Sequence, residues 1–329
     1  MSLPEFKLLR PKTLEEAVAL LARHAGNIQV IAGGTDLIPS LRQRLFAPSF
    51  VLDIRGIDAL KQVRVRPGLG VEIGALVTLS KIEDSEFILR NYPVLHAAAM
   101  TVASPVIRNM ATLGGNVCLD TRCLWYNQSL QWRKSCGFCL KKDGDLCHVA
   151  PGGQRCWAAF SGDTPPALLC LEAEIEVAGP RGLRRMPLRD LYTNDGIARM
   201  KLAQDELLTQ VILPERMAGW QGAYKKLRIR GSIDYPLAGV AVALKKNGRG
   251  IEDARVAITA VNPAPLLIAD ADNALRGKRS GDELEHAAMV VGELAARIAK
   301  PLTTSALTPE YRREMVRVFT KRAVLAAAQ

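Results

Sequence analysis

The stretch that decides the fold is Ile28-Gln29-Val30-Ile31-Ala32-Gly33-Gly34-Thr35-Asp36-Leu37. Residues 28–32 predict a short buried strand, and the paired glycines after it predict a tight turn whose neighbouring amide N–H groups are free to face a phosphate. The turn favours a pyrophosphate, although a plain structural turn fits the pattern equally well. It is neither a G-x-G-x-x-G fingerprint nor a P-loop. Because Asp36 would repel a phosphate, we expect its side chain to cap local amides.

A helix is expected just before this strand. Thr13 and Glu16 form a capping box, and the apolar residues that follow lie on one helical face until Gly26. At the other end of the chain, Thr308 as N-cap and Pro309 at the first helical position predict a long packing helix. The chain therefore mixes helices and strands from its first residues to its last.

A second glycine segment spans residues 107–116, Ile-Arg-Asn-Met-Ala-Thr-Leu-Gly-Gly-Asn, after Ala103-Ser104-Pro105. Small residues let a backbone turn approach a flat ring closely. Asn109, Thr112 and Asn116 offer neutral donors and acceptors suited to the carbonyls and hydroxyls of a flavin. The alternative is a polar loop capped by its own asparagines.

Five cysteines lie within 34 residues: Cys123, Cys136, Cys139, Cys147 and Cys156. The N-terminal residues form no apolar signal region, and no run of about 18 apolar residues indicates a membrane span. We therefore expect a cytoplasmic protein, in which stable disulfides are rare. The chain has seven cysteines, an odd number, and only four histidines, which favours thiolate ligation of a soft metal. On ligand identity alone, zinc and an iron–sulfur cluster remain equal.

Composition limits the kind of partner. At 329 residues with 48% hydrophobic content, the chain is long enough for two or three domains. The net charge of +11 suits an acidic partner, but the basic residues are dispersed and aromatic residues make up only 5%. Nucleic acid is therefore not expected, whereas an acidic protein partner is.

Three segments together carry a resemblance to a known family: residues 31–37, residues 74–79 (Gly-Ala-Leu-Val-Thr-Leu), and residues 107–116. They resemble the FAD-binding medium subunits of the xanthine oxidase and carbon monoxide dehydrogenase family, along essentially the whole chain. The resemblance implies an α+β protein, with two α/β subdomains of the PCMH-type FAD-binding fold that clasp FAD and a smaller C-terminal α+β domain. It also implies a molybdenum-cofactor subunit and a [2Fe–2S] subunit as partners.

The cysteine-rich stretch is an insertion relative to most such flavoproteins, in which the second glycine loop returns quickly to the Ser161-Gly162-Asp163 element. Residues 123–128 and 152–156 are similar to the branch of the family formed by 4-hydroxybenzoyl-CoA reductases, whose insertion houses a [4Fe–4S] cluster. That resemblance implies Cys123, Cys139, Cys147 and Cys156 as ligands. The spacing Cys136-x-x-Cys139 keeps Cys136 as an alternate ligand. A flavin nearby favours a cluster over zinc, because a cluster relays single electrons.

The remaining cysteines and one histidine receive packing roles. Cys118 is expected to pack beside the flavin loop. Cys170 lies in an apolar run, within a strand expected over residues 168–177, and is expected to be a buried thiol. His148 is expected to be solvated or to lie behind the ligands, since a histidine beside a loop cysteine is more often not a ligand itself.

The C-terminal domain is expected to begin near Gly219, after strand and loop elements over residues 186–191, and to contain an apolar strand over residues 238–244. The resemblance implies an aromatic residue and a lysine near the isoalloxazine, for which Tyr224 and Lys226 are the candidates, with Lys225 possible. A lysine there would stabilise the anionic reduced flavin. The alternative is a pair of surface lysines.

These expectations combine into one description. Residues 1–57 and 58–218 form the two FAD-binding subdomains, with the cluster insertion at about 120–160, and residues 219–329 form the C-terminal domain. The expected function is electron transfer between a ferredoxin-type donor, a [4Fe–4S] cluster and FAD, for the reduction of 4-hydroxybenzoyl-CoA to benzoyl-CoA in a dimer of heterotrimers. The alternatives are a hydroxylase flavoprotein that delivers electrons to NAD or O₂, and a zinc-stapled FAD scaffold. The expected FAD contacts are Ala32, Gly33, Gly34, Thr35, Asp36, Leu37, Ser104, Asn109, Thr112, Gly115, Asn116, Asp163, Tyr224 and Lys226.

The insertion is also rich in positive charge. Five basic residues of the insertion are expected to form a positive surface that steers an acidic donor toward the cluster: Arg133, Lys134, Lys141, Lys142 and Arg155.

Overall fold

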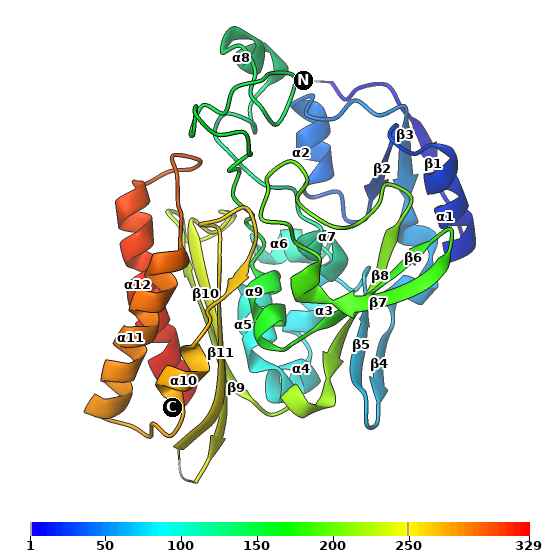
Figure 1. Cartoon of the computed structure of the whole chain (residues 1–329). Coiled ribbons are helices and arrows are strands. Elements are labelled where there is room, and N and C mark those ends of the chain that lie inside the picture. The colour runs from blue at the N-terminus through cyan, green and yellow to red at the C-terminus, as the bar shows by residue number, and fades with distance from the viewer. Residues whose placement is uncertain (1, 249) are drawn as a thin grey trace.

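The computed structural model describes residues 2–248 and 250–329 and arranges them around three β-sheets (Figure 1). The first sheet is parallel, with the order β1-β3-β2, and comprises β1 (Lys7–Leu9), β2 (Ile28–Ile31) and β3 (Phe50–Asp53). Its helices are α1 (Leu14–Arg23) and α2 (Leu37–Arg42). Thr13 caps α1 as predicted, since its hydroxyl accepts a hydrogen bond from the Glu16 amide.

The second sheet is antiparallel, with the order β4-β5-β8-β6-β7. Its strands are β4 (Val63–Arg66), β5 (Gly70–Gly74), β6 (Glu174–Gly179), β7 (Gly182–Pro187) and β8 (Leu207–Pro214). Between β5 and β6 the chain forms the helices α3 (Leu79–Glu83), α4 (Glu86–Asn91), α5 (Pro93–Met100), α6 (Pro105–Arg108), α7 (Leu113–Val117), α8 (Leu130–Ser135) and α9 (Thr164–Cys170). Four short 3-10 turns complete these regions: η1 (Ile54–Gly56), η2 (Asp58–Lys61), η3 (Leu188–Asp190) and η4 (Glu215–Met217).

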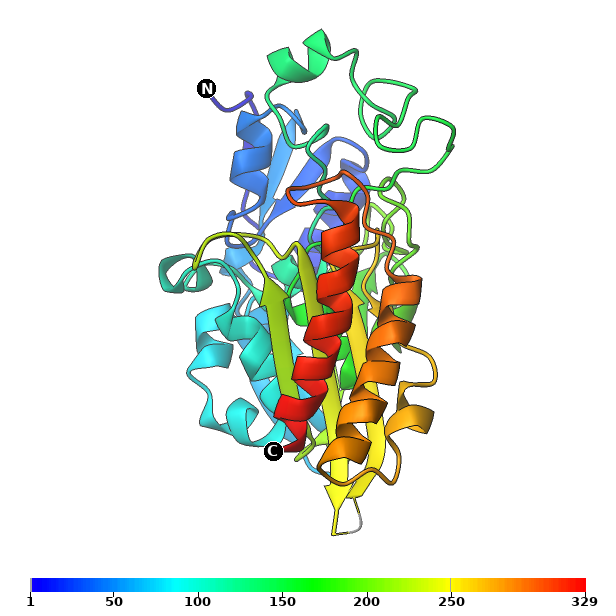
Figure 2. The ribbon, with the colours of Figure 1, turned by 90° about the vertical axis from the view of Figure 1, so that its left-hand side faces the viewer.

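The third sheet lies between two layers of helices. It is antiparallel, with the order β12-β11-β10-β9, and comprises β9 (Gln221–Leu227), β10 (Ala238–Asn247), β11 (Gly250–Thr259) and β12 (Leu266–Leu267). One face packs on α10 (Ala271–Leu275), α11 (Asp282–Ile298) and α12 (Pro309–Ala328), which Figure 2 shows in front of the strands. The other face packs on α5 and α9, so the second and third sheets share one apolar core.

All but one of the helices and strands predicted from the sequence agree with those in the structure. The strand at residues 28–32, the strand at 238–244 and the helix after Thr308 are confirmed, with Thr308 capping the Tyr311 amide. The strand expected over residues 168–177 is wrong in its first half, because Thr164–Cys170 forms α9 and only Glu174–Gly179 is a strand. Prolines at the start of α9 suit a first helical turn, and burial on every side hides the periodicity that distinguishes helix from strand.

The cysteine-rich insertion is a loop that projects beyond the sheets, near α2 in Figure 1. Within residues 120–160, all of which the structure describes, α8 is the single helix. The two ends of the insertion are tied by a backbone bridge between Arg122 and Ala159, with N–O distances of 2.8 Å in both directions. Farther out, the buried Arg133 donates hydrogen bonds to the carbonyls of Gln43 and Arg44 after α2. These contacts dock the loop on the first sheet's connecting turn.

Candidate flavin cavity and cysteine site

The two glycine segments meet directly. A Cβ atom on Gly33 would lie 1.8 Å from the Met110 carbonyl oxygen, so only glycine lets the two backbones approach this closely. Gly34 follows with a φ of +74°, in the left-handed region that favours glycine. In the second segment, a Cβ on Gly114 would lie 2.7 Å from that of Ala75. The glycines therefore serve first to pack one segment on the other and on Ala75, the residue after β5.

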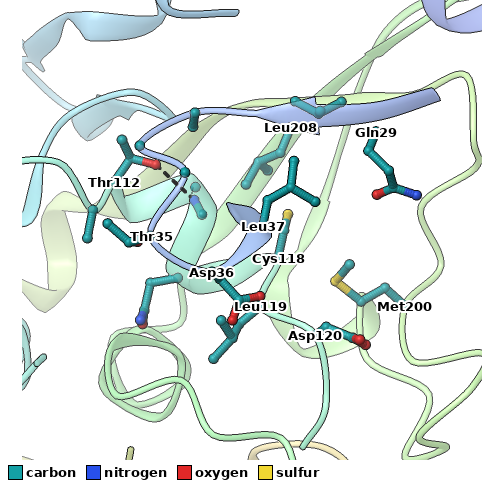
Figure 3. Close-up of a pocket in the computed structure, with 18 of the residues that line it drawn as sticks. Gln29, Thr35, Asp36, Leu37, Thr112, Cys118, Leu119, Asp120, Met200 and Leu208 are labelled. Carbon is teal, nitrogen blue, oxygen red and sulfur yellow. Dashed lines mark hydrogen bonds between the residues drawn. The ribbon is translucent and has the colours of Figure 1, made fainter. Parts of the chain in front are cut away.

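A cavity of about 850 Å³ opens where these segments meet, within the size range of cofactor pockets (Figure 3). Its walls come from the strand and turn of residues 28–37, from the second glycine segment, from residues 197–208, and from residues 233–235 of the C-terminal domain. The predicted contacts that line it are Ala32, Gly33, Gly34, Thr35, Asp36, Leu37, Thr112, Gly115, Asn116 and Asp163. The volume and the lining fit a cofactor.

Four predicted contacts are not among the lining residues: Ser104, Asn109, Tyr224 and Lys226. The Ser104 hydroxyl caps α6 by accepting a hydrogen bond from the Ile107 amide. Asn109 is exposed and accepts a hydrogen bond of 2.6 Å from the Ser80 hydroxyl. A role for either residue toward a flavin stays a prediction.

The expectation that Asp36 caps local amides is wrong. It stands at the N-cap of α2, but its side chain makes no capping hydrogen bond. Instead, Arg122 donates to its Oδ1 at 2.6 Å and the Tyr235 hydroxyl lies 3.1 Å from the same oxygen. The Arg122 guanidinium also stacks over the Tyr235 ring, 3.9 Å from the ring centroid. These three residues join the first sheet, the base of the insertion and the C-terminal domain at the cavity wall.

The side chains of Thr112 and Asn116 already form hydrogen bonds within the protein. The Thr112 hydroxyl accepts the Gly115 amide at the start of α7, at 3.1 Å (Figure 3). Asn116 Oδ1 accepts both the amide and the hydroxyl of Thr164, at 3.0 and 2.7 Å, where α9 begins. The Asn116 amide nitrogen, a donor, is then the group suited to an acceptor atom of a bound ligand.

Behind the cavity wall lies a buried ion pair. Asp163 lines the cavity, and its two carboxylate oxygens bind the Tyr224 hydroxyl at 2.8 Å and the Lys226 ammonium at 2.9 Å. The side chains of Asp163 and Lys226 are 4% and 3% exposed, so the alternative of a surface lysine is wrong for Lys226. Burial raises the pKa of Asp163, and the Lys226 charge works against that rise. Tyr224 and Lys226 therefore reach the cavity through Asp163.

Four cysteines gather around a second, small cavity inside the insertion. Its lining contains Cys123, Cys139, Cys147 and Cys156, the four thiols that the resemblance implies as ligands. The other three cysteines, all within the described residues, lie elsewhere: Cys118 lines the flavin cavity, Cys170 is buried in α9, and Cys136 caps the C-terminal end of α8. All seven are free thiols. His148 also lines the small cavity, where it stacks on Trp125 with ring centroids 4.3 Å apart.

The four thiols are the donor type that a metal cluster uses. Burial raises the pKa of Cys123 and of Cys156 to about 11, so both are neutral thiols until a cation compensates for their charge. Among the described residues, no group of three or more His, Cys, Asp or Glu side chains has the geometry to hold one metal ion. A tetrahedral zinc site needs four sulfurs at about 2.3 Å from a single point. The donors are thus gathered around a space without converging on one ion position.

The expected positive surface of the insertion is partly wrong. The side chains of Arg133 and Lys141 are only 1% and 7% exposed, since each is bonded within the protein. Lys134, Lys142 and Arg155 remain at or near the surface. Sequence alone did not separate the two sets, because a buried lysine on a loop requires a buried carboxylate elsewhere, here Asp120.

Comparison with known proteins identifies the class. The family model described as the FAD binding domain in molybdopterin dehydrogenase matches residues 4–216, and that of the CO dehydrogenase flavoprotein C-terminal domain matches residues 222–327. The chain therefore belongs to the FAD-binding medium subunits of the xanthine oxidase and carbon monoxide dehydrogenase family, the flavoproteins of molybdenum hydroxylase complexes.

Individual relatives agree along nearly the whole chain. The carbon monoxide dehydrogenase medium chain of Afipia carboxidovorans is 31% identical over 97% of this chain and 95% of its own length. The nicotine 6-hydroxylase medium subunit of Paenarthrobacter nicotinovorans is 29% identical over 99% of both. A solved structure of Cu,Mo-CO dehydrogenase superposes with a TM-score of 0.81 at 29% identity, covering 100% of this chain and 99% of that one. The expected PCMH-type fold with its added C-terminal domain is confirmed.

Proposed function

We propose that this chain is the electron-transfer flavoprotein subunit of a molybdenum enzyme that reductively removes the hydroxyl group of 4-hydroxybenzoyl-CoA, giving benzoyl-CoA. In this proposal the chain holds FAD and one [4Fe–4S] cluster, and passes electrons between a ferredoxin-type donor and its partner subunits. The observation that carries the proposal is the gathering of Cys123, Cys139, Cys147 and Cys156 around one cavity, apart from Cys136. These are the thiols implied by the resemblance to 4-hydroxybenzoyl-CoA reductases.

FAD is assigned to the larger cavity. The Gly33-Gly34 turn and the second glycine segment would let backbone approach the cofactor closely, and the Asn116 amide would donate to an acceptor atom on it. Bound FAD would supply the exchange between two-electron and one-electron chemistry. Asp163, held by Lys226 and Tyr224, places a fixed polar group in the same wall. The chain's own residues thus bind and orient the cofactor and set the charge around it.

The cluster is assigned to the smaller cavity. Four thiolates are the ligand set of a [4Fe–4S] cluster, and the cluster would supply a one-electron relay. The walls around the cysteines include the buried Tyr126 and the partly buried Trp125, which limit the contact of the site with solvent. Within the same assembly we propose a molybdenum-cofactor subunit and a [2Fe–2S] subunit as partners, in a cytoplasmic dimer of heterotrimers. Of the described residues, none forms a helix with the length and apolar character needed to cross a bilayer.

The test is anaerobic purification with metal, sulfide and flavin analysis. We expect about four irons and four sulfides with one FAD per chain. Stoichiometric zinc without iron would contradict the cluster and leave a zinc-stapled FAD scaffold. Assays with 4-hydroxybenzoyl-CoA and reduced ferredoxin then test the reaction. Turnover only in the oxidative direction, with NAD or O₂ as acceptor, would assign a hydroxylase instead, the kind of activity in the name of the nicotine 6-hydroxylase relative.

Donor entry has its own test. Three basic residues at or near the surface of the insertion, Lys134, Lys142 and Arg155, would attract an acidic donor. Raising the salt concentration should then slow reduction by ferredoxin while leaving reduction by a small neutral donor unchanged. Equal salt dependence for both donors would contradict entry at this surface.

A further inference from the structure

The flavin cavity and the cysteine cavity share a wall built from charged and aromatic side chains. Asp120 and Arg199 line the flavin cavity, whereas Tyr126 and Lys141 line the cysteine cavity. Asp120 joins the two sides: its Oδ1 lies 2.7 Å from the Lys141 ammonium and 3.4 Å from Arg199 Nε, and its Oδ2 accepts the Tyr126 hydroxyl at 3.1 Å. We call these four residues the boundary group.

Lys141 is the most firmly fixed member of the boundary group. Besides Asp120, its ammonium reaches the Gly196 carbonyl at 2.8 Å, the Thr121 carbonyl at 3.2 Å and the Thr121 hydroxyl. It also lies over the Tyr126 ring, 4.5 Å from the ring centroid. With the side chain 7% exposed and its donors engaged, the position of this charge is set by the protein.

The charges of the boundary group do not balance. One carboxylate faces two cations, because both Lys141 and Arg199 pair with Asp120. Burial opposes ionisation of Asp120, but the two cations outweigh it and hold the pKa of this carboxyl below its usual range. Lys141 by itself would neutralise Asp120, so Arg199, whose side chain is 31% exposed, carries a charge that no carboxylate of the boundary group balances. Arg199 Nε, in addition, is buried without a hydrogen-bond acceptor among the described residues. The boundary group as a whole therefore carries a net positive charge at the wall between the two cavities.

We infer that the boundary group is a fixed positive charge placed between the two cofactor sites, with Lys141 as the positioning residue on the cluster side and Arg199 on the flavin side. The inference rests on the proposed function for the identity of the cluster. A cation in a poorly solvated wall stabilises the more negative, reduced form of a neighbouring centre. It therefore raises the reduction potential of the centre that it faces and keeps both centres accessible to electrons from one donor.

The test uses three substitutions in the complex purified anaerobically with its partner subunits. Lys141→Met and Arg199→Met each remove one charge of the boundary group, and Lys142→Met is the matched control, since its side chain is adjacent in sequence but 40% exposed. Redox titration followed by electron paramagnetic resonance gives the potential of the cluster, and optical titration gives that of the flavin. We expect Lys141→Met to lower the cluster potential more than the flavin potential. Arg199→Met should do the reverse, and Lys142→Met should change neither.

Each of the other possible results either supports or overturns the inference. Wild-type potentials in Lys141→Met and Arg199→Met that retain iron and FAD would overturn the inference. If Lys141→Met loses its iron, Lys141→Arg tests the charge: full iron in the arginine variant supports the inference, and loss in both assigns Lys141 to packing and overturns it. If the wild-type chain contains FAD but no iron, the proposed function is contradicted, and this result is distinct from a failure of the inference. The flavin potentials of the two methionine variants would then still test the charge on the flavin side.

Discussion

The flavin cavity and the cysteine cavity are neighbours made in different ways. Backbone segments anchored to sheets form the first, with glycines at the positions where the segments approach most closely, as the 1.8 Å from a Gly33 Cβ to Met110 shows. Side chains on a loop form the second, and α8 is the single helix in that insertion, which the structure describes completely. A cavity formed by backbone should lose its ligand when a larger side chain is added. A cavity formed by side chains should lose its ligand when a ligating group is removed. The predictions below test that difference.

The largest effect is expected from Gly33→Val. The new side chain would overlap the Met110 backbone, which has no flexible end to move aside, so the two glycine segments must separate. We expect loss of most bound FAD after gel filtration and a decrease of about 3 kcal/mol in the free energy of unfolding. Gly152→Val is the control, since nothing lies within 4 Å of its Cβ position. Retention of FAD by a folded Gly33→Val protein would show that the cofactor lies elsewhere.

The converse change removes chemistry and adds no bulk. Cys139→Ser should abolish iron binding and leave FAD bound, because Cys139 lines the small cavity and not the large one. Ferredoxin-driven turnover should fall, while reduction of the flavin by a small artificial donor survives. Cys136→Ser serves as the control and should keep its iron. Iron loss in the Cys136 variant, with retention in the Cys139 variant, would reverse the ligand assignment.

Lys226→Met tests the ion pair behind the flavin cavity. With the lysine gone, Asp163 is left buried without its cation, which typically costs about 3 kcal/mol or more. The pKa of Asp163 should rise further, because burial already raises it and Lys226 is the first charge that opposes this rise. Thermal unfolding measures the loss of stability. The pH dependence of the flavin absorption spectrum reports the change in the pKa of Asp163. Lys225→Met, at the neighbouring position of β9, should change the stability and the flavin spectrum much less. Equal effects of the two substitutions would show that Lys226 has no specific role at the cavity.

The smallest effect is expected where the two cavities meet. A Cβ on Gly196 would lie 2.5 Å from Cys156 Sγ, and the Gly196 amide donates to the Cys156 carbonyl. In a cluster-free protein the thiol is able to rotate away, but a thiol bound to iron is not. Gly196→Ala should therefore lower the iron content or slow cluster incorporation, with little change in FAD content. Unchanged iron with unchanged kinetics of incorporation would indicate that Cys156 is not a ligand.

The sequence by itself determined the parts of this protein that depend on local chemistry. Paired glycines after a strand, hydroxyl caps before helices and the clustered thiols are visible in neighbouring residues. They correctly placed β2, α1 and α12, and ten of the residues predicted to contact FAD line one cavity. The four-cysteine set came from resemblance, since spacing alone left Cys136 open. The helix α9 was not predicted, because all of its residues are buried and their sequence therefore shows no helical periodicity.

Tertiary structure decided how distant charges pair. Asp36 meets Arg122 and Tyr235, and Lys141 is buried against Asp120 instead of standing on the surface. It also decided that Lys226 reaches the flavin cavity through Asp163. The physical reason is that the free energy of a charged side chain depends on burial and on the position of its partner, and the folded chain alone sets both.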